Sequence, residues 1–232
     1  MSGNDVYTAG SVTTTSNGTT HLLARVWKNG NVTTLNTYPR DAEATSVFVE
    51  GSDVYVAGYQ TSQAGFRVAT VWKNGIPISL SNNTEDEWAT AVFASNGNVY
   101  VSGFREGTPQ LMEQAKVWKN GVEMVIGSPY RFTIATSVFV SNNDVYVGGS
   151  QTDSLGVKPQ ATIWKNGVVH FTDTATVYGS SISSVFVKDS VIYAVGQDSN
   201  TAGDRAKLWT NGIGTFLTSP STRSIGLGLY VN

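Results

Sequence analysis

The sequence contains no cysteine, which excludes disulfide bonds, thiolate metal ligands and thiol nucleophiles. Charged residues make up only 14% of its 232 residues, and 15 Lys and Arg nearly balance 17 Asp and Glu. A net charge of −2, with neither sign concentrated in one stretch, argues against a nucleic-acid groove or an anionic-membrane surface. No apolar run approaches the roughly 20 residues that a membrane helix needs. We therefore expect neither a nucleic-acid partner nor membrane insertion.

Recognisable catalytic and cofactor motifs are also missing. The chain has no phosphate-binding loop, dinucleotide-binding glycine pattern, calcium loop or nucleophile elbow. Its two histidines, His21 and His170, show no metal-ligand spacing. We expect no metal, no cofactor and no catalytic residue.

What the chain does contain is a tandem repeat. The string Val-Trp-Lys-Asn-Gly or a near variant occurs five times, with its tryptophans spaced by 45 or 46 residues. This period is typical of the blades of a β-propeller. The five tryptophans are Trp27, Trp72, Trp118, Trp164 and Trp209.

Each repeat predicts four antiparallel strands. A nearly continuous apolar run such as 44–49 is typical of a strand covered on both faces, and it is followed by a small-residue strand such as 53–58. The third strand ends at the tryptophan, and the Asn-Gly step after it predicts a type I′ hairpin turn into the fourth. Asp5, Asp53 and Asp144 recur at the start of the second strand, where bonding within a tight turn is favoured over a metal ring.

The two ends of the sequence predict that the ring closes. The segment 4–10 resembles a second strand without a first one before it, and 226–231 resembles the missing first strand. Pairing them would remove two open sheet edges. The fold class predicted is a single all-β, five-bladed β-propeller over residues 1–232. Its blades are predicted at 223–232 with 4–35, then 42–80, 88–126, 134–171 and 181–217.

These residues carry a family resemblance. The tryptophan that ends the third strand makes each repeat resemble a WD-repeat blade, although Trp-Lys or Trp-Thr replaces Trp-Asp. The Val-Tyr-Val-Ala-Gly and Trp-Lys-Asn-Gly strings are similar to bacterial tandem repeats over nearly the whole chain. Five blades of this length also resemble the tachylectin-type sugar-binding propellers, at the level of the fold alone.

Candidate binding residues are the aromatics outside the repeated positions. Fifteen of the 25 aromatic residues occupy three repeated positions and are assigned to the core, among them Tyr230. Trp88 stands outside the repeat beside acidic residues, so a sugar platform and a simple cover of the blade end are both open. The candidate ligand-binding residues are Trp88, Asp86 and Glu87, then Tyr130 and Arg131; Tyr38, Tyr59, Phe104 and Tyr178 belong to the same class.

The predicted function is a non-enzymatic binding or interaction module, a monomer that takes a carbohydrate or protein ligand on its loop-rich face. A lectin-like, multivalent glycan binder is the favoured form, and low charge with Ser/Thr/Asn-rich loops favours an extracellular or cell-surface location. The alternatives are a structural scaffold, a propeller excised or engineered from a longer array, and a glycoside hydrolase. The hydrolase is disfavoured because no predicted inner strand contains Asp or Glu, so Glu43 and Glu87 just before two of them would have to serve.

Overall fold

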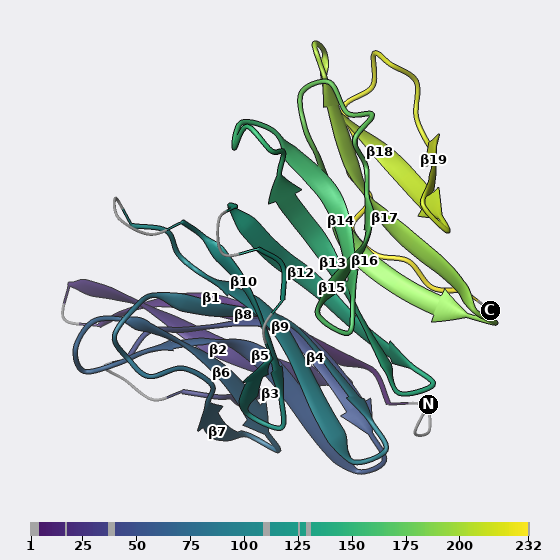
Figure 1. Cartoon of the computed structure of the whole chain (residues 1–232). Coiled ribbons are helices and arrows are strands. Elements are labelled where there is room, and N and C mark those ends of the chain that lie inside the picture. Colours follow the sequence, from purple (N-terminus) through teal and green to yellow (C-terminus); the bar gives the residue numbers. More distant parts are fainter. Residues whose placement is uncertain are drawn as a thin grey trace. The chain divides into compact units, whose positions relative to one another are not determined.

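The computed structural model describes residues 5–16, 18–36, 40–108, 112–124, 126–128 and 131–231. Over these residues it is all-β, with one three-stranded and four four-stranded antiparallel sheets, one for each repeat (Figure 1). The architecture is consistent with a five-bladed propeller. The described residues include no apolar helix of membrane-spanning length.

In every sheet the strands lie in sequence order. The first sheet holds β1 (Tyr7–Ser16), β2 (Thr19–Lys28) and β3 (Asn31–Thr34). The second holds β4 (Ala42–Glu50), β5 (Asp53–Thr61), β6 (Arg67–Lys73) and β7 (Ile76–Ser79). The third holds β8 (Glu87–Ser95), β9 (Asn98–Arg105), β10 (Gln114–Lys119) and β11 (Val122–Met124). The fourth holds β12 (Thr133–Ser141), β13 (Asp144–Thr152), β14 (Pro159–Lys165) and β15 (Val168–Thr172). The fifth holds β16 (Ser180–Lys188), β17 (Val191–Asn200), β18 (Gly203–Thr210) and β19 (Ile213–Phe216).

The chain divides into two compact units, residues 1–106 with 117–123 and residues 107–116 with 124–232. In the first unit, Trp72 packs with Leu35 and Ala42, and Trp118 packs with Leu80 in a second cluster. In the second unit, Trp209 packs with other buried residues of β13, β14, β16 and β17. Four of the five repeated tryptophans are at most 1% exposed, as predicted for core residues; they are Trp72, Trp118, Trp164 and Trp209.

The Asn-Gly hairpin turns have the predicted backbone. At Asn74 and Gly75 φ is 51° and 84°, and the other four Asn-Gly steps are also positive at both positions, as a type I′ turn requires. The Asn74 side chain also ties two turns together, because its Oδ1 accepts the amide of Val54 at 2.8 Å and its Nδ2 donates to Asp53 at 2.8 Å. Asp53 therefore bonds to a neighbouring turn, where we had predicted bonding within its own turn.

A repeated glycine permits a bulge in the first strand of each four-stranded sheet. The register between β4 and β5 shifts between Ala44 and Ser46, and the β4 backbone moves close to Gly58. A Cβ built on Gly58 would lie 1.8 Å from the carbonyl oxygen of Glu43, which no side chain tolerates. The bulged residue Thr45 then donates its hydroxyl to the carbonyl of Ala89 at 2.9 Å, which joins β4 to β8.

The C-terminal segment differs from the prediction. Residues 223–231 form no strand, and the sheet that contains β1 has three strands. The segment lies against the fifth sheet, where Ser224 and Gly226 donate their amides to the carbonyls of Asp204 and Gly196. Tyr230 is 73% exposed, so its assignment to the core was wrong; its ring meets that of Phe186 edge-on at 5.6 Å. Pairing of 227–231 with β1 stays a prediction.

Candidate functional site

Trp88 is the centre of an aromatic cluster in the first unit. It lies in β8 directly opposite Phe104 of β9, and the two rings stack with centroids 5.1 Å apart and planes 13° apart. Tyr59 of β5 meets Trp88 edge-on at 6.2 Å. Tyr59 and Phe104 occupy the same repeat position, the residue after the strand glycine, so two neighbouring repeats supply the cluster. Trp88 and Phe104 are half-buried, and Tyr59 is buried.

Arg67 brings charge to these rings. Its guanidinium lies 4.9 Å from the ring centroid of Trp88 and 5.6 Å from that of Tyr59, within range of cation–π attraction. The same guanidinium reaches Asp86 at 3.7 Å and Glu106 at 3.8 Å. The backbone amide of Arg67 also donates to Asp86 at 2.6 Å, which fixes the start of β6 beside the start of β8.

The predicted pair of Trp88 and Asp86 is therefore brought together through Arg67, but Glu87 is not part of the cluster. Successive side chains of a strand point to opposite faces, so Glu87 points away from both neighbours and is only 5% exposed. Sequence reasoning missed Arg67 and Glu106. Arg67 begins β6, directly after the loop 62–66. No sequence pattern near this loop predicts that Arg67 contacts the next repeat.

The hydroxyl of Tyr59 lies between opposite charges. Burial raises the pKa of Tyr59, and the nearby carboxylates of Glu43 and Asp41 raise it further, while Arg67 opposes both effects. The phenol stays protonated at neutral pH and can donate or accept a hydrogen bond.

Three carboxylates stand on the first strands of the sheets, Glu43 and Glu50 in β4 and Glu87 in β8, which corrects our prediction that no such strand contains one. Strands β4 and β8 begin two residues earlier than the apolar runs, because Ala42 still pairs with Gln60 and Glu87 still pairs with Arg105. Glu43 is half-buried in β4, and Glu87 is the first residue of β8.

The second candidate pair is only partly described. Tyr130 lies outside the described residues, as does Tyr38. Arg131 is half-buried, and its guanidinium donates to the carbonyl of Thr152 at 3.1 Å. Tyr178 is 56% exposed.

The recurring aspartates are ion-paired to lysine. Asp53 accepts from Lys73 at 2.7 Å, and the hydrogen bonds from Lys73 and Asn74 hold the pKa of Asp53 below its ordinary value. Asp5 with Lys28 and Asp144 with Lys165 repeat this arrangement at 2.8 Å and 2.7 Å. Among the described residues no three His, Asp or Glu side chains are grouped so as to hold a metal ion.

A buried charge network in the second unit was not predicted. Lys207 donates to Asp173 and to Asp198 at 2.6 Å each, and all three residues are at most 7% exposed. Thr176 donates to Asp198 at 3.1 Å. The carboxylates of Asp173 and Asp198 are thus bonded to partners within the protein, which is typical of a structural role.

Comparison with known proteins assigns the chain to no family. No family model and no curated protein matches it. Among solved structures, it is similar to a GH43 β-xylosidase/α-arabinofuranosidase from a compost microbial metagenome, in complex with xylotriose, at 12% identity and a TM-score of 0.42 over 98% of this chain and 96% of that one. A GH43_1 enzyme from Xanthomonas citri, also with xylotriose, matches at 13% identity and 0.44 over 78% and 74%. A Pyrococcus horikoshii acylaminoacyl peptidase matches at 12% and 0.47, over 86% of this chain but 31% of that one.

These similarities correct the predicted function. The sugar-complexed structures that resemble this chain are glycoside hydrolases, which contradicts our assignment to a non-enzymatic binding or interaction module. Identities of 12–13% and TM-scores below 0.5 carry no further argument, so neither substrate nor catalytic residues transfer to this chain.

Proposed function

We propose that this chain recognises a glycoside at the aromatic cluster of Tyr59, Trp88 and Phe104. The observation that carries the proposal is the arrangement of Arg67, which lies over two of these rings and is flanked by two carboxylates. Aromatic surface beside a few convergent polar groups is the usual composition of a small-molecule site.

The polar groups of the cluster are accessible to a ligand. The side chains of Arg67, Asp86 and Glu106 are 42%, 31% and 48% exposed. Carboxylates accept hydrogen bonds from sugar hydroxyls and the guanidinium donates to ring or hydroxyl oxygens. The half-buried edge of Trp88 supplies apolar contact. A neutral sugar suits this set because one guanidinium faces two carboxylates.

Hydrolysis of the bound glycoside is the second candidate. It is favoured by the position of Glu43 and Glu87 at the start of β4 and β8, two inner strands joined through Thr45. Glycoside hydrolysis uses two carboxyl groups about 5 to 10 Å apart. Glu43 is the better exposed of the two and would be the residue nearer the substrate.

The test is calorimetry with a panel of neutral oligosaccharides, followed by mass spectrometry of the products. Binding by the wild type that Trp88→Ala weakens supports recognition at the cluster, and Arg67→Gln should weaken it as well. Product that disappears in Glu43→Gln or Glu87→Gln would assign hydrolysis. An absence of binding to every member of the panel would refute the proposal.

We infer further that the five sheets are the blades of one closed propeller spanning residues 1–232. The support is in the sequence, where 226–231 matches the first strand that the β1–β3 sheet lacks. Closure by this segment would remove an open sheet edge.

A further inference from the structure

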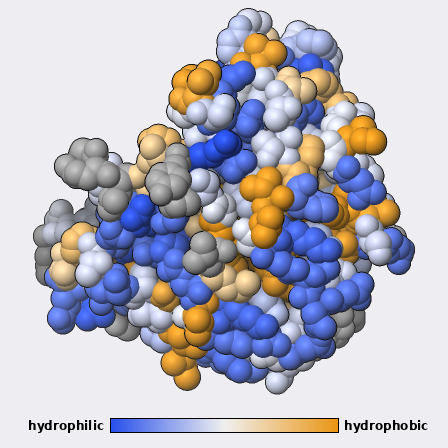
Figure 2. Space-filling view, in the orientation of Figure 1, coloured by the Kyte–Doolittle hydropathy of each residue, from blue (hydrophilic) through white to orange (hydrophobic). Residues whose placement is uncertain are grey.

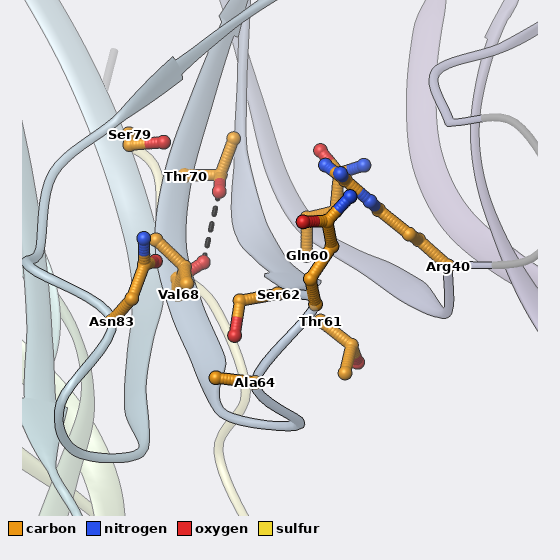
Figure 3. Close-up of a pocket in the computed structure, with 10 residues that line it drawn as sticks. Arg40, Gln60, Thr61, Ser62, Ala64, Val68, Thr70, Ser79 and Asn83 are labelled. Carbon is orange, nitrogen blue, oxygen red and sulfur yellow. Dashed lines mark hydrogen bonds between the residues drawn. The ribbon is translucent and has the colours of Figure 1, made fainter.

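A polar cavity of about 300 Å³ lies in the first unit, at the loop-rich end of the second sheet (Figure 3). Its volume is at the lower end of the roughly 300 to 1,000 Å³ that ligand pockets occupy. Among the ten residues that line it, Arg40, Gln60, Ser62 and Asn83 carry the argument. The ten include one guanidinium, three amides and four hydroxyls, but no carboxylate.

This cavity is separate from the Trp88 cluster. Gln60 follows Tyr59 in β5, so its side chain points to the opposite face of the sheet. Figure 3 shows Arg40 and Gln60 reaching toward one another across one side of the cavity. Arg40 is exposed, and among the described residues no carboxylate lies within ion-pair distance of its guanidinium. The nearest one along the chain, Asp41, is bonded to His21 and to the amide of Leu22.

The strand register shows what occupies the same position in other repeats. Gln60, Arg105 and Gln151 each pair with the first residue of the preceding strand, and Arg40, Glu85 and Arg131 stand two residues before that strand begins. The pairs Arg40 with Gln60, Glu85 with Arg105, and Arg131 with Gln151 are therefore equivalent.

In the third repeat the arginine at this position is neutralised by a carboxylate of the same repeat. Arg105 and Glu85 form an ion pair at 3.5 Å, with side chains 14% and 34% exposed. The fold thus holds a guanidinium against a carboxylate at this place. In the second repeat the guanidinium comes from Arg40, but the facing residue is the neutral Gln60.

The second unit repeats the arrangement. Arg131 and Gln151 line another cavity, of about 490 Å³, and Arg131 is held by the carbonyl of Thr152. The described part of the second unit thus also has an arginine and a glutamine at these equivalent positions beside a cavity.

We propose that the Arg40 cavity binds the carboxylate of a small, hydroxylated ligand, with a uronate sugar as the class that fits it. Arg40 supplies the planar, two-pronged donor that carboxylates prefer. The amides and hydroxyls of Gln60, Ser62 and Asn83 supply both donors and acceptors for ring hydroxyls. The proposal stands independently of glycoside recognition at Trp88, because it uses the other face of the sheet.

The experiment is calorimetric titration of the full chain with D-glucuronate, with D-glucose as the uncharged counterpart and inorganic phosphate as a bare anion. We expect glucuronate to bind, and Arg40→Gln to weaken it at least about tenfold, the usual size of losing a charged hydrogen bond. Arg40→Lys should bind glucuronate more tightly than Arg40→Gln but less tightly than the wild type, because an ammonium lacks the two parallel N–H donors of a guanidinium.

The matched control is Lys119→Gln, which removes one exposed positive charge from the turn end of the third sheet. It should leave glucuronate binding unchanged. Equal loss in Lys119→Gln and Arg40→Gln, equal binding of glucose, or phosphate binding as tightly as glucuronate would each overturn the proposal. Neutral oligosaccharides test the Trp88 cluster separately, so the two failures are distinguishable.

Discussion

Trp209 and Asp173 are joined by a 2.9 Å hydrogen bond from the indole Nε1 to the carboxylate Oδ2. In the part of the chain that the structure describes, the equivalent buried indoles reach no hydrogen-bond partner; they are those of Trp72, Trp118 and Trp164. The amide of Asp173 bonds to the tryptophan-bearing strand β14, as the amides of Leu35 and Leu80 bond to β2 and β6, so an aspartate stands where those repeats have a buried leucine. Among these four described tryptophans, Trp209 therefore has a carboxylate beside its indole nitrogen, whereas Trp72 and Trp118 pack with leucine.

The first prediction is that Asp173→Leu destabilises the protein although it restores the leucine of the other repeats. Lys207 would stay buried with one of its two carboxylates gone, and breaking a buried pair costs about 3 to 5 kcal/mol. The triple variant Asp173→Leu, Asp198→Gln and Lys207→Thr removes all three buried charges and copies Leu80, Gln60 and Thr70 of the second repeat, so it should recover much of the loss. Urea denaturation measures both, and a single variant as stable as the wild type would contradict the network's role.

The second prediction concerns pH. Burial acts against the charge on Asp173 and Lys207, but their mutual hydrogen bonds outweigh it, so the pKa of Asp173 is lowered and that of Lys207 is raised. The stability contributed by Asp173 is present above its unfolded pKa and lost as pH falls through its folded value. That contributed by Lys207 is present below its unfolded pKa and lost as pH rises through its folded value.

The triple variant should therefore show a flatter dependence of the urea midpoint on pH than the wild type, at both the acid and the alkaline end. Identical pH profiles for the two proteins would show that the network does not control this dependence.

The third prediction compares two tryptophans. Trp72 is fully buried, so Trp72→Ala should cost about 3 to 5 kcal/mol of unfolding free energy. Trp88 is half-buried at the start of a strand, and Trp88→Ala should cost clearly less. Equal melting temperatures would be inconsistent with these positions.

The fourth prediction tests the bulge. Gly58→Ala places a methyl group against the carbonyl of Glu43 and should lower the melting temperature strongly, because the backbone on both sides must move. Gly228→Ala is the control, since a Cβ there meets nothing within 4 Å. A Gly58→Ala protein as stable as this control would argue against the close strand approach.

The fifth prediction tests closure of the propeller. Deletion of 223–232 should expose a sheet edge and lead to unfolding or oligomerisation. Light scattering with thermal melting checks it. A truncated protein that stays monomeric with an unchanged melting temperature would contradict closure.

The sequence predicted the features that local chemistry decides. The five sheets follow from the repeat, and the turn at Asn74 and Gly75 follows from the need for positive φ. The start of β8 at Glu87 could not be read from hydrophobicity, because the strand begins at a charged residue before its apolar run. The contact of Arg67 with Trp88 joins residues of neighbouring repeats through a loop, for which no short-range signal exists. Asp173 could have been found by aligning it with Leu35 and Leu80.

The visible surface carries no large apolar patch. Figure 2 shows hydrophobic residues in small separate groups among polar ones, without one continuous apolar face. Exposed apolar residues such as Ile76, Val122 and Ile213 directly follow the Asn-Gly turns of the outermost strands.

The central claim is that a glycoside binds at Trp88, and tryptophan fluorescence tests it most directly. Four of the other five tryptophans are at most 1% exposed, and the fifth, the half-buried Trp27, is kept in Trp88→Phe, so the part of the emission change that this variant removes comes from Trp88. The account predicts a saturable change in the wild type that is lost in Trp88→Phe, while calorimetry shows that Trp88→Ala weakens binding. A fluorescence change and an affinity that both persist unaltered in Trp88→Ala would contradict it.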